Sequence, residues 1–143
     1  MTDRIIKKII EGQEIVTATA DTTVSDAASL MRDKHIGAVI VVENGKLAGI
    51  FTERDALFRV IAQGLDPGTT DIGSVMTPNP QTIHPDRPVG HALHMMFEGG
   101  FRHVPVVEDG RPIGMVSSRD ALGPELIEFT HELETRDHIA DIL

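Results

Sequence analysis

The feature that most constrains this 143-residue sequence is an internal repeat. The string GIFTERD begins at Gly49, and the similar string GMVSSRD begins at Gly114, 65 residues later (114 − 49 = 65). Sliding the chain by these 65 residues aligns residues 17–57 with residues 82–122 without a gap, and 15 of the 41 aligned pairs are identical. Self-similarity at a fixed period indicates two copies of one supersecondary unit.

Each copy predicts the same order of elements, β-α-β-β-α. An extended piece (residues 15–19 or 80–84) leads to a helix, then to two strands joined by an Asn-Gly or Asp-Gly turn, which is a strong hairpin signal. A second helix follows, over residues 53–63 in the first copy, and Thr23 with Asp26 predicts a cap on the first helix. Apolar residues at helical spacing predict three buried helix faces: Val24, Ala27, Ala28 and Met31; Val89, Ala92, Leu93 and Met96; Ala56, Leu57, Val60 and Ile61.

The fold class predicted is therefore α/β (α+β), with two units that must pack on each other because neither can bury two helices and a three-stranded sheet alone. We expect an N-terminal helix (1–14), a first unit (15–63), a linker (64–79), a second unit (80–125) and a C-terminal helical extension (126–143). In that extension Leu126, Leu133 and Ala140 are seven residues apart. This spacing fits a partner helix or a helix lying on its own domain, and the sequence leaves both open.

Composition excludes several classes of function. The chain has no cysteine, so it has no disulfides, thiolate metal sites or cysteine nucleophile. Its net charge of −9 and its five aromatic residues, all Phe, argue against a nucleic-acid partner. The longest apolar run, residues 38–42, is too short for a membrane helix. We expect a soluble, cytoplasmic protein with no membrane partner.

The repeated string places a hydroxyl and a carboxylate three residues apart, at Thr52 and Asp55 and again at Ser117 and Asp120. Both pairs fall where a predicted strand ends and a helix begins. One interpretation is structural, with the hydroxyl residue capping the helix and the aspartate favoured in its first turn. The other is functional, because ligands of α/β proteins bind where strands end, and a short carboxylate can accept both hydroxyls of a ribose.

The tandem β-α-β-β-α units and the pattern Gly-apolar-x-Thr/Ser-x-x-Asp resemble a pair of cystathionine β-synthase (CBS) domains, also called a Bateman module, of the small stand-alone bacterial type. The resemblance covers about residues 15–125 and rests on strings such as HIGAVIVV, GIFTERD, VMTPNPQTI and FRHVPVVEDGRPIGMVS. It implies two units packed through their sheets about a pseudo-twofold axis, with two clefts for adenosine ligands: AMP, ADP, ATP, NAD or S-adenosylmethionine. It also implies a disc-like homodimer and an unknown downstream protein partner, with no required cofactor.

Carried over residue by residue, the resemblance implies two sites, which we name the Asp55 cleft and the Asp120 cleft. The Asp55 cleft would use Thr52, Arg54, Asp55, Thr82, Ile83, Arg102, His103 and Pro105. The Asp120 cleft would use Ser117, Asp120, Thr17, Gly37, Ala38 and Ile40. The first copy departs from the pattern, since Gly37 and Ala38 stand where the second has Arg102 and His103. Phosphate binding is therefore expected in the Asp55 cleft, unless Lys34, Arg54, Arg59 or Arg119 reaches into the other.

Other functions have weaker support in the sequence. It contains no nucleophile paired with a base, no Walker loop and no Rossmann glycine run, so we expect no enzyme activity. His91, His94 and Glu98 could hold a metal ion from one helix, although a surface helix is their ordinary explanation. The main alternative is a protein-interaction scaffold whose clefts stay empty.

Overall fold

The computed structural model describes residues 4–121 and 124–142. A short helix, α1 (Ile6–Ile10), precedes the first unit. That unit comprises β1 (Thr17–Ala18), α2 (Val24–Lys34), β2 (Ala38–Glu43), β3 (Lys46–Thr52), α3 (Glu53–Asp55) and η1 (Ala56–Ile61). The connection contains η2 (Ile72–Ser74) and β4 (Thr77–Pro78). The second unit comprises α4 (Val89–Gly99), β5 (His103–Glu108), β6 (Arg111–Ser117) and η3 (Ser118–Ala121), followed by α5 (Pro124–Ile142).

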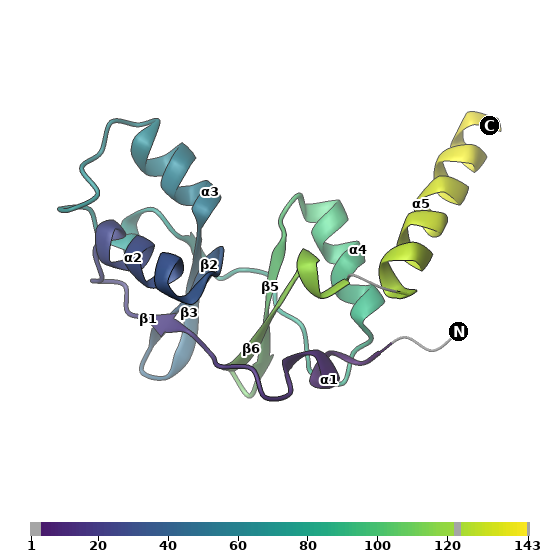
Figure 1. Ribbon diagram of the computed structural model, residues 1–143, viewed down its shortest axis with the longest axis horizontal. Coiled ribbons are helices and arrows are strands. Elements are labelled where there is room, and N and C mark those ends of the chain that lie inside the picture. Colours follow the sequence, from purple (N-terminus) through teal and green to yellow (C-terminus); the bar gives the residue numbers. More distant parts are fainter. Residues whose placement is uncertain (1–3, 122–123, 143) are drawn as a thin grey trace.

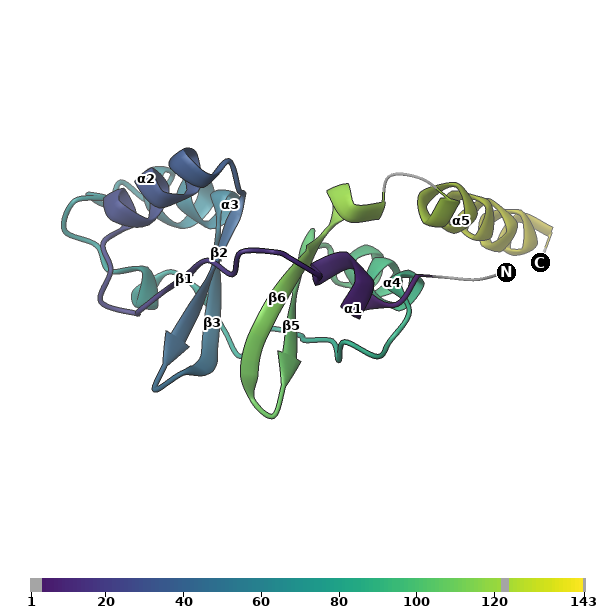
Figure 2. The ribbon, with the colours of Figure 1, turned by 60° about the horizontal axis from the view of Figure 1, so that its bottom comes forward.

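The two units lie with their sheets side by side in the middle of the molecule and their helices outside (Figure 2). Strand β3 of the first unit lies against β6 of the second. Helix α5 begins against α4 of the second unit, where Phe129 packs on the core, and its C-terminal end extends away from both units (Figure 1). The predicted class, an α/β fold of two packed units, is confirmed. Of the spaced residues in the C-terminal extension, the side chains of Leu126 and Ala140 lie outside the described part.

Both predicted hairpin turns form as the sequence indicates. Asn44 and Gly45 have φ angles of 53° and 76°, and Asp109 and Gly110 have φ angles of 55° and 78°. Two consecutive residues with positive φ define the tight hairpin turn whose twist matches that of its strands, and Asn, Asp and Gly adopt it at low cost. The repeat therefore reproduces its turn at the level of backbone angles.

The first helix of each unit packs its apolar face into a separate core. In α4 all four predicted residues are buried, whereas in α2 the prediction is wrong for Ala28, which is exposed. The predicted cap on α2 is confirmed, because the backbone N–H of Asp26 donates to Thr23 Oγ1 at 3.1 Å. Each unit thus holds its own core, and the clefts described below form where the units meet.

The second helix of the first unit departs from prediction. Val60 is fully buried, but Leu57 and Ile61 are 51% and 66% exposed. Within η1 the backbone bonds are of the wider i→i+5 kind, such as Ala62 N–H to the Leu57 carbonyl at 2.9 Å. More residues then enter each turn, so the 3.6-residue spacing no longer selects one face. Leu57, Phe58 and Ile61 form an exposed apolar patch.

The sheets also differ from the predicted three strands per unit. The first has four strands in the order β1-β2-β3-β4, because β4 from the connection pairs antiparallel with β3, placing Ile50 opposite Thr77. The second has β5 and β6, with one parallel bridge between Ile83 and Val106. The edge strand of the first unit is thus covered by the segment that leads into the second.

A side chain takes the place of β4 in the second unit. Met115, the repeat counterpart of Ile50 (50 + 65 = 115), donates its N–H to Gln13 Oε1 at 2.8 Å, and Gln13 Nε2 donates to the Met115 carbonyl at 3.0 Å. Gly114 permits this approach, because a Cβ there would lie 2.7 Å from Ile10 Cγ2. The segment leading into the first unit therefore covers the edge of the second. Each unit is thus hydrogen-bonded to the segment that leads into the other unit.

We expect Gln13→Ala to lower the free energy of unfolding by about 1–2 kcal/mol, since two hydrogen bonds to β6 are lost at about 0.5–1.5 kcal/mol each. Urea denaturation followed by circular dichroism measures the effect. Glu11→Ala, an exposed neighbour, is the control and should change stability by less than about 0.5 kcal/mol. Equal stability of the two variants would contradict the role given to Gln13.

Candidate functional site

Two clefts lie between the units, and equivalent segments line them. The Asp120 cleft, of about 250 Å³, is lined by residues 13–16 and 35–38 of the first unit and by the end of β6 with the start of η3. The Asp55 cleft, of about 610 Å³, is lined by residues 79–81 and 99–103 and by the end of β3 with α3. The larger cleft falls within the range of about 300–1,000 Å³ found for ligand pockets, and the smaller lies just below it.

The aspartates of the repeated motif are bound to their own backbone. The N–H of Thr52 donates to Asp55 Oδ2 at 2.9 Å, and the N–H of Asp55 donates to Thr52 Oγ1 at 3.2 Å. In the second copy the N–H of Ser117 donates to Asp120 Oδ2 at 2.7 Å, and the Ser117 hydroxyl lies 3.4 Å from the same oxygen. The reciprocal pair at Thr52 and Asp55 is a capping box. The capping interpretation is therefore confirmed for the first copy, and the second keeps the aspartate half of it.

Capping does not exclude a ligand role, because it engages one oxygen of each carboxylate. Both aspartates also line their clefts. Asp55 is only 7% exposed, and its other oxygen, Oδ1, lies 3.5 Å from Nε of Arg59. Oδ1 is thus the atom through which either aspartate could accept a hydrogen bond from a ligand.

Most of the predicted site residues line the cleft to which they were assigned. Those in the Asp55 cleft are Thr52, Arg54, Asp55, Arg102 and His103. Those in the Asp120 cleft are Gly37, Ala38, Ile40, Ser117 and Asp120. Each set combines residues of both units, as the resemblance implied.

Four of the predicted residues lie outside the linings of both clefts. Ile83 and Pro105 line neither cleft, because both are buried in the second unit, where Ile83 packs in the core beneath α4. Thr17 and Thr82 line neither cleft because each lies just beyond the segment that does. Residues 14–16 and 79–81 occupy those places, and they are related by the same shift of 65. Their sequences differ at all three positions, so the repeat gave no signal for them.

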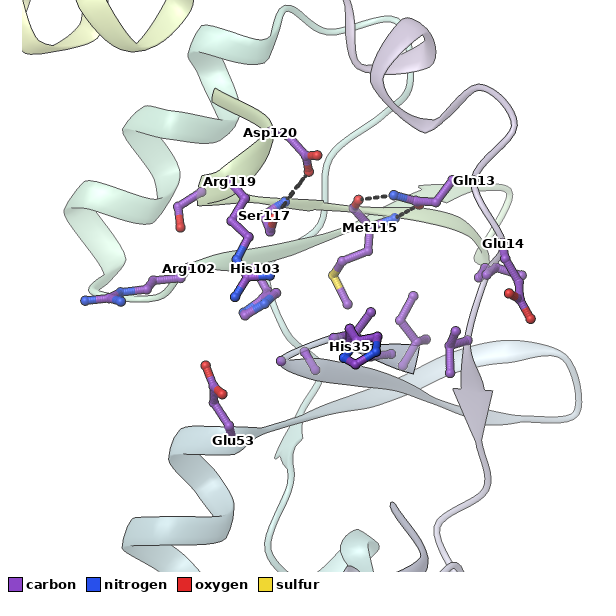
Figure 3. A pocket seen from close by; sticks show the side chains of 17 residues that line it. Gln13, Glu14, His35, Glu53, Arg102, His103, Met115, Ser117, Arg119 and Asp120 are labelled. Carbon is purple, nitrogen blue, oxygen red and sulfur yellow. Dashed lines mark hydrogen bonds between the residues drawn. The ribbon is translucent and has the colours of Figure 1, made fainter. Parts of the chain in front are cut away.

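Three residues line both clefts and form a shared wall: Glu53, Arg102 and His103. Gly37 makes room for this wall, because a Cβ there would lie 3.1 Å from Glu53 Oε1 and 3.4 Å from His103 Cε1. The N–H of Glu53 donates to the Gly37 carbonyl at 2.9 Å, which fixes the start of α3 beside the wall. Figure 3 shows Glu53 and His103 extending toward one another from opposite units.

The environment of His103 in this wall lowers its affinity for a proton. Burial lowers the pKa of His103 from 6.5, because the charged ring loses water, and this effect exceeds the opposing attraction of Glu53. Arg119 and Arg102 lower the pKa further, and Asp120 raises it. The ring is therefore uncharged at neutral pH, and the positive charge of the predicted Arg-His pair comes from Arg102 alone.

The basic side chains are unequally distributed. Arg54 and Arg59 line the Asp55 cleft, where Arg54 Nη1 donates to the Gly100 carbonyl at 3.3 Å and Arg59 Nη1 to the Met76 carbonyl at 3.1 Å. Arg119 lines the Asp120 cleft. Lys34 lines neither, since its Nζ is bound to Glu14 Oε1 at 2.9 Å. Of the cations considered as substitutes in the Asp120 cleft, only Arg119 lines it.

The sequence also suggests a metal site as an alternative. In the described ranges, no three His, Asp or Glu side chains are grouped so that they could hold a metal ion. His94 instead pairs with Glu132 of α5, at 2.7 Å between Nε2 and Oε2, and its ring meets Phe129 edge-on. Across residues 4–121 and 124–142, no helix is both long and apolar enough to span a membrane.

Comparison with known proteins identifies the family. The CBS domain model matches twice, at residues 6–62 and 72–123, and the chain therefore belongs to the CBS domain family. The two matches coincide with the two halves of the repeat. They begin upstream of the unit boundaries that we expected at residues 15 and 80, which remain a proposal.

Curated relatives are CBS proteins of different lengths. The mitochondrial protein CBSX3 of Arabidopsis thaliana is 39% identical over 121 residues, which cover 81% of this chain and 59% of that protein. YhcV of Bacillus subtilis is 30% identical over 128 residues, covering 83% of this chain and 91% of that protein. The chain thus spans little more than half of the plant relative, and only about a fifth of another, CBSCBSPB3 of Arabidopsis thaliana.

Solved structures share the fold. A protein with CBS domains from Burkholderia ambifaria superposes with a TM-score of 0.78 at 33% identity, covering 82% of this chain and 90% of that one. The CBS domain pair of protein MJ0100, in complex with 5′-methylthioadenosine and S-adenosyl-L-methionine, superposes with a TM-score of 0.74 at 31% identity, covering 83% and 93%.

The lowered pKa of His103 predicts a loss of stability in acid. The unfolded chain, with a His pKa near 6.5, binds the proton more readily than the folded chain, so the free energy of unfolding falls as the pH drops below 6.5 and levels off below the folded pKa. We expect wild type to lose more stability than His103→Asn between about pH 7.5 and about pH 5. Urea denaturation at both pH values measures this.

His91→Asn removes an exposed imidazole from α4 and serves as the control, with a pH response close to that of wild type. If His103→Asn loses as much stability in acid as wild type does, the assignment of this dependence to His103 is wrong.

Proposed function

We propose that this chain is a non-catalytic regulatory module that binds adenosine ligands in its two clefts. The observation that carries the proposal is the pair of equivalent clefts, each built from both units with a motif aspartate in its wall. The bound 5′-methylthioadenosine and S-adenosylmethionine of the MJ0100 pair support it, because that pair has the same fold at 31% identity.

In this proposal the ribose lies beside the motif aspartate. Oδ2 of Asp55 or Asp120 keeps its backbone N–H, and Oδ1 accepts the ribose hydroxyls. The Thr52 hydroxyl already accepts the N–H of Asp55, so its proton is directed outward and can be donated to the ligand. The base would enter between the segment preceding the opening strand and the start of the β2 or β5 strand, which line each cleft together.

Phosphate groups would bind preferentially in the Asp55 cleft. Arg54, Arg59 and Arg102 line it, and guanidinium groups are well suited to bind phosphate because they donate two parallel hydrogen bonds. Its volume of about 610 Å³ also leaves more room than the 250 Å³ of the Asp120 cleft. AMP, ATP and NAD are the candidates for this cleft.

Such binding would act as a signal because each cleft spans both units. A ligand that touches the two units stabilises the relative arrangement it fits best, and it shifts the equilibrium by its difference in affinity between arrangements. The consequence would pass to an unidentified protein partner. A cytoplasmic location also remains a proposal, supported by the cysteine-free composition.

A specific observation favours the alternative, an interaction scaffold with empty clefts. Both motif aspartates are already satisfied by their own backbone, so neither leaves an unpaired carboxylate that would require a ligand. The two functions differ in one measurable respect, since only the regulatory module should bind a nucleotide tightly.

We expect Asp55→Asn and Asp120→Asn each to weaken nucleotide binding at one cleft by about tenfold, because a hydrogen bond to a charged group contributes about 1.5–3 kcal/mol and one to a neutral amide only about 0.5–1.5 kcal/mol. Asn is preferred over Ala because its carbonyl can still accept the capping N–H, whereas loss of a cap costs about 1 kcal/mol of stability. Isothermal titration with AMP, ATP, NAD and S-adenosylmethionine gives the affinities.

Asp71→Asn, which removes an exposed carboxylate outside both clefts, is the matched control and should bind like wild type. Wild-type affinity in the double variant Asp55→Asn/Asp120→Asn would contradict the ribose assignment. Absence of binding to any of the four compounds by wild type would favour the scaffold.

We also propose a homodimer, supported by the apolar patch of Leu57, Phe58 and Ile61, which are 51–66% exposed. Large apolar groups gathered on a surface favour a protein interface. Ile61→Asp should therefore convert a dimer to monomer in sedimentation velocity, while Gln63→Asp, an exposed change nearby, should not. A wild-type monomer, or a dimer that both variants keep, would contradict this interface.

A further inference from the structure

Glu53 is an uncompensated charge in the wall that the clefts share. Among the described residues, no hydrogen bond or ion pair engages its carboxylate; only its backbone N–H is bound, to the Gly37 carbonyl. Its Oε1 lies 3.1 Å from where a Cβ of Gly37 would be, so the carboxylate occupies the space that this glycine leaves. The Glu53 carboxylate points into the Asp120 cleft, toward the side of Arg102 and His103 (Figure 3).

Only the first copy of the repeat carries this charge. The repeat counterpart of Glu53 is the uncharged Ser118 (53 + 65 = 118), and the counterpart of Gly37 is Arg102 (37 + 65 = 102). The backbone bond is the same in both copies, because the Ser118 N–H donates to the Arg102 carbonyl at 3.0 Å. The two clefts thus share a backbone geometry and differ in the charges attached to it.

Counting full charges gives the clefts opposite signs. Two arginines and three carboxylates line the Asp120 cleft: Arg102, Arg119, Glu14, Glu53 and Asp120. Three arginines and two carboxylates line the Asp55 cleft: Arg54, Arg59, Arg102, Glu53 and Asp55. The uncharged ring of His103 alters neither balance.

The other two carboxylates of the Asp120 cleft have bonding partners in the protein. Glu14 is ion-paired with Lys34 at 2.9 Å, and Asp120 accepts the Ser117 N–H at 2.7 Å. With Glu14 paired, Arg102 and Arg119 balance Glu53 and Asp120, so the Glu53 charge is what keeps this cleft from being positive like the other. In the Asp55 cleft the same residue is outweighed, because Arg54 and Arg59 are added to Arg102.

We propose that Glu53 is a specificity-determining residue of the Asp120 cleft, which it makes selective for uncharged or cationic adenosyl compounds over phosphorylated ones. This inference rests on the proposed function, since it assumes that the cleft binds adenosine compounds. A phosphate placed beside Glu53 meets a like charge, whereas a sulfonium at the same place meets an opposite one. Each such pair, a few ångström apart near a protein surface, changes affinity by about tenfold.

The experiment uses the full chain carrying Asp55→Asn, which weakens the Asp55 cleft so that titrations report on the other. Three probes differ in charge at the 5′ position: AMP (anionic), 5′-methylthioadenosine (uncharged) and S-adenosylmethionine (cationic sulfonium). In this background we expect S-adenosylmethionine to bind more tightly than AMP. Adding Glu53→Gln, which preserves size and polarity, should tighten AMP and weaken S-adenosylmethionine by about tenfold each, and so reduce their affinity ratio by about a hundredfold.

Two internal controls separate charge from structure. The affinity for 5′-methylthioadenosine should stay the same in Glu53→Gln, because no ionic interaction is altered, whereas a structural change would move all three affinities together. Glu43→Gln removes an exposed carboxylate outside both clefts and should leave the ratio unchanged. The preference of the Asp55→Asn protein should also weaken as salt is raised.

The outcomes distinguish this inference from the proposed function. An unchanged ratio in Glu53→Gln, or a preference for AMP in the Asp55→Asn background, overturns the role of Glu53 while leaving nucleotide binding intact. A ratio that changes as much in Glu43→Gln assigns the effect to net charge and also overturns it. If no probe binds even the wild-type chain, the proposed function fails and this inference fails with it.

Discussion

The structure depends on two connecting segments, each of which is hydrogen-bonded to the edge strand of one unit and leads into the other. Strand β4, which leads into the second unit, pairs with β3 of the first, and Gln13, which leads into the first unit, is bonded to Met115 of the second. The residues that follow these contacts, 14–16 and 79–81, line the two clefts. The interactions that hold the units together therefore also build the walls between which a ligand would bind.

The duplication preserved geometry more strictly than charge. Hairpin turns, strand registers and the aspartate that accepts a backbone N–H recur in both copies. The residues at the shared wall do not, since Gly37 and Glu53 of one copy correspond to Arg102 and Ser118 of the other. Because backbone contacts position the clefts, side chains at the wall can change without disturbing the fold, and two similar sites can differ in the ligands they accept.

Much of the fold could be predicted from the sequence, because local signals and the repeat specify it. Helix α4 buries its four predicted residues, and Thr23 caps α2 as its spacing indicates. The bonding of Gln13 to the edge of β6 could not be predicted. Neither periodicity nor turn chemistry indicates that a side chain will bond to a strand residue 102 positions away, in the place that a paired strand takes in the other unit. The exposure of Ile61 was also missed, because helical spacing assumes 3.6 residues per turn and η1 departs from it.

For the site, the repeat identifies the motif aspartates, whereas the burial of Ile83 in the opening segment and of Pro105 within β5 depends on packing inside the second unit, which the repeat does not encode. We propose that each motif aspartate accepts a hydrogen bond from its own backbone and from a ligand at the same time. A crystal structure with bound 5′-methylthioadenosine or AMP tests it most directly. We predict ribose hydroxyls within hydrogen-bonding distance of Oδ1 of Asp55 or Asp120, with Oδ2 still accepting its backbone N–H. A nucleoside bound elsewhere, or with its ribose turned away from both carboxylates, would contradict the account.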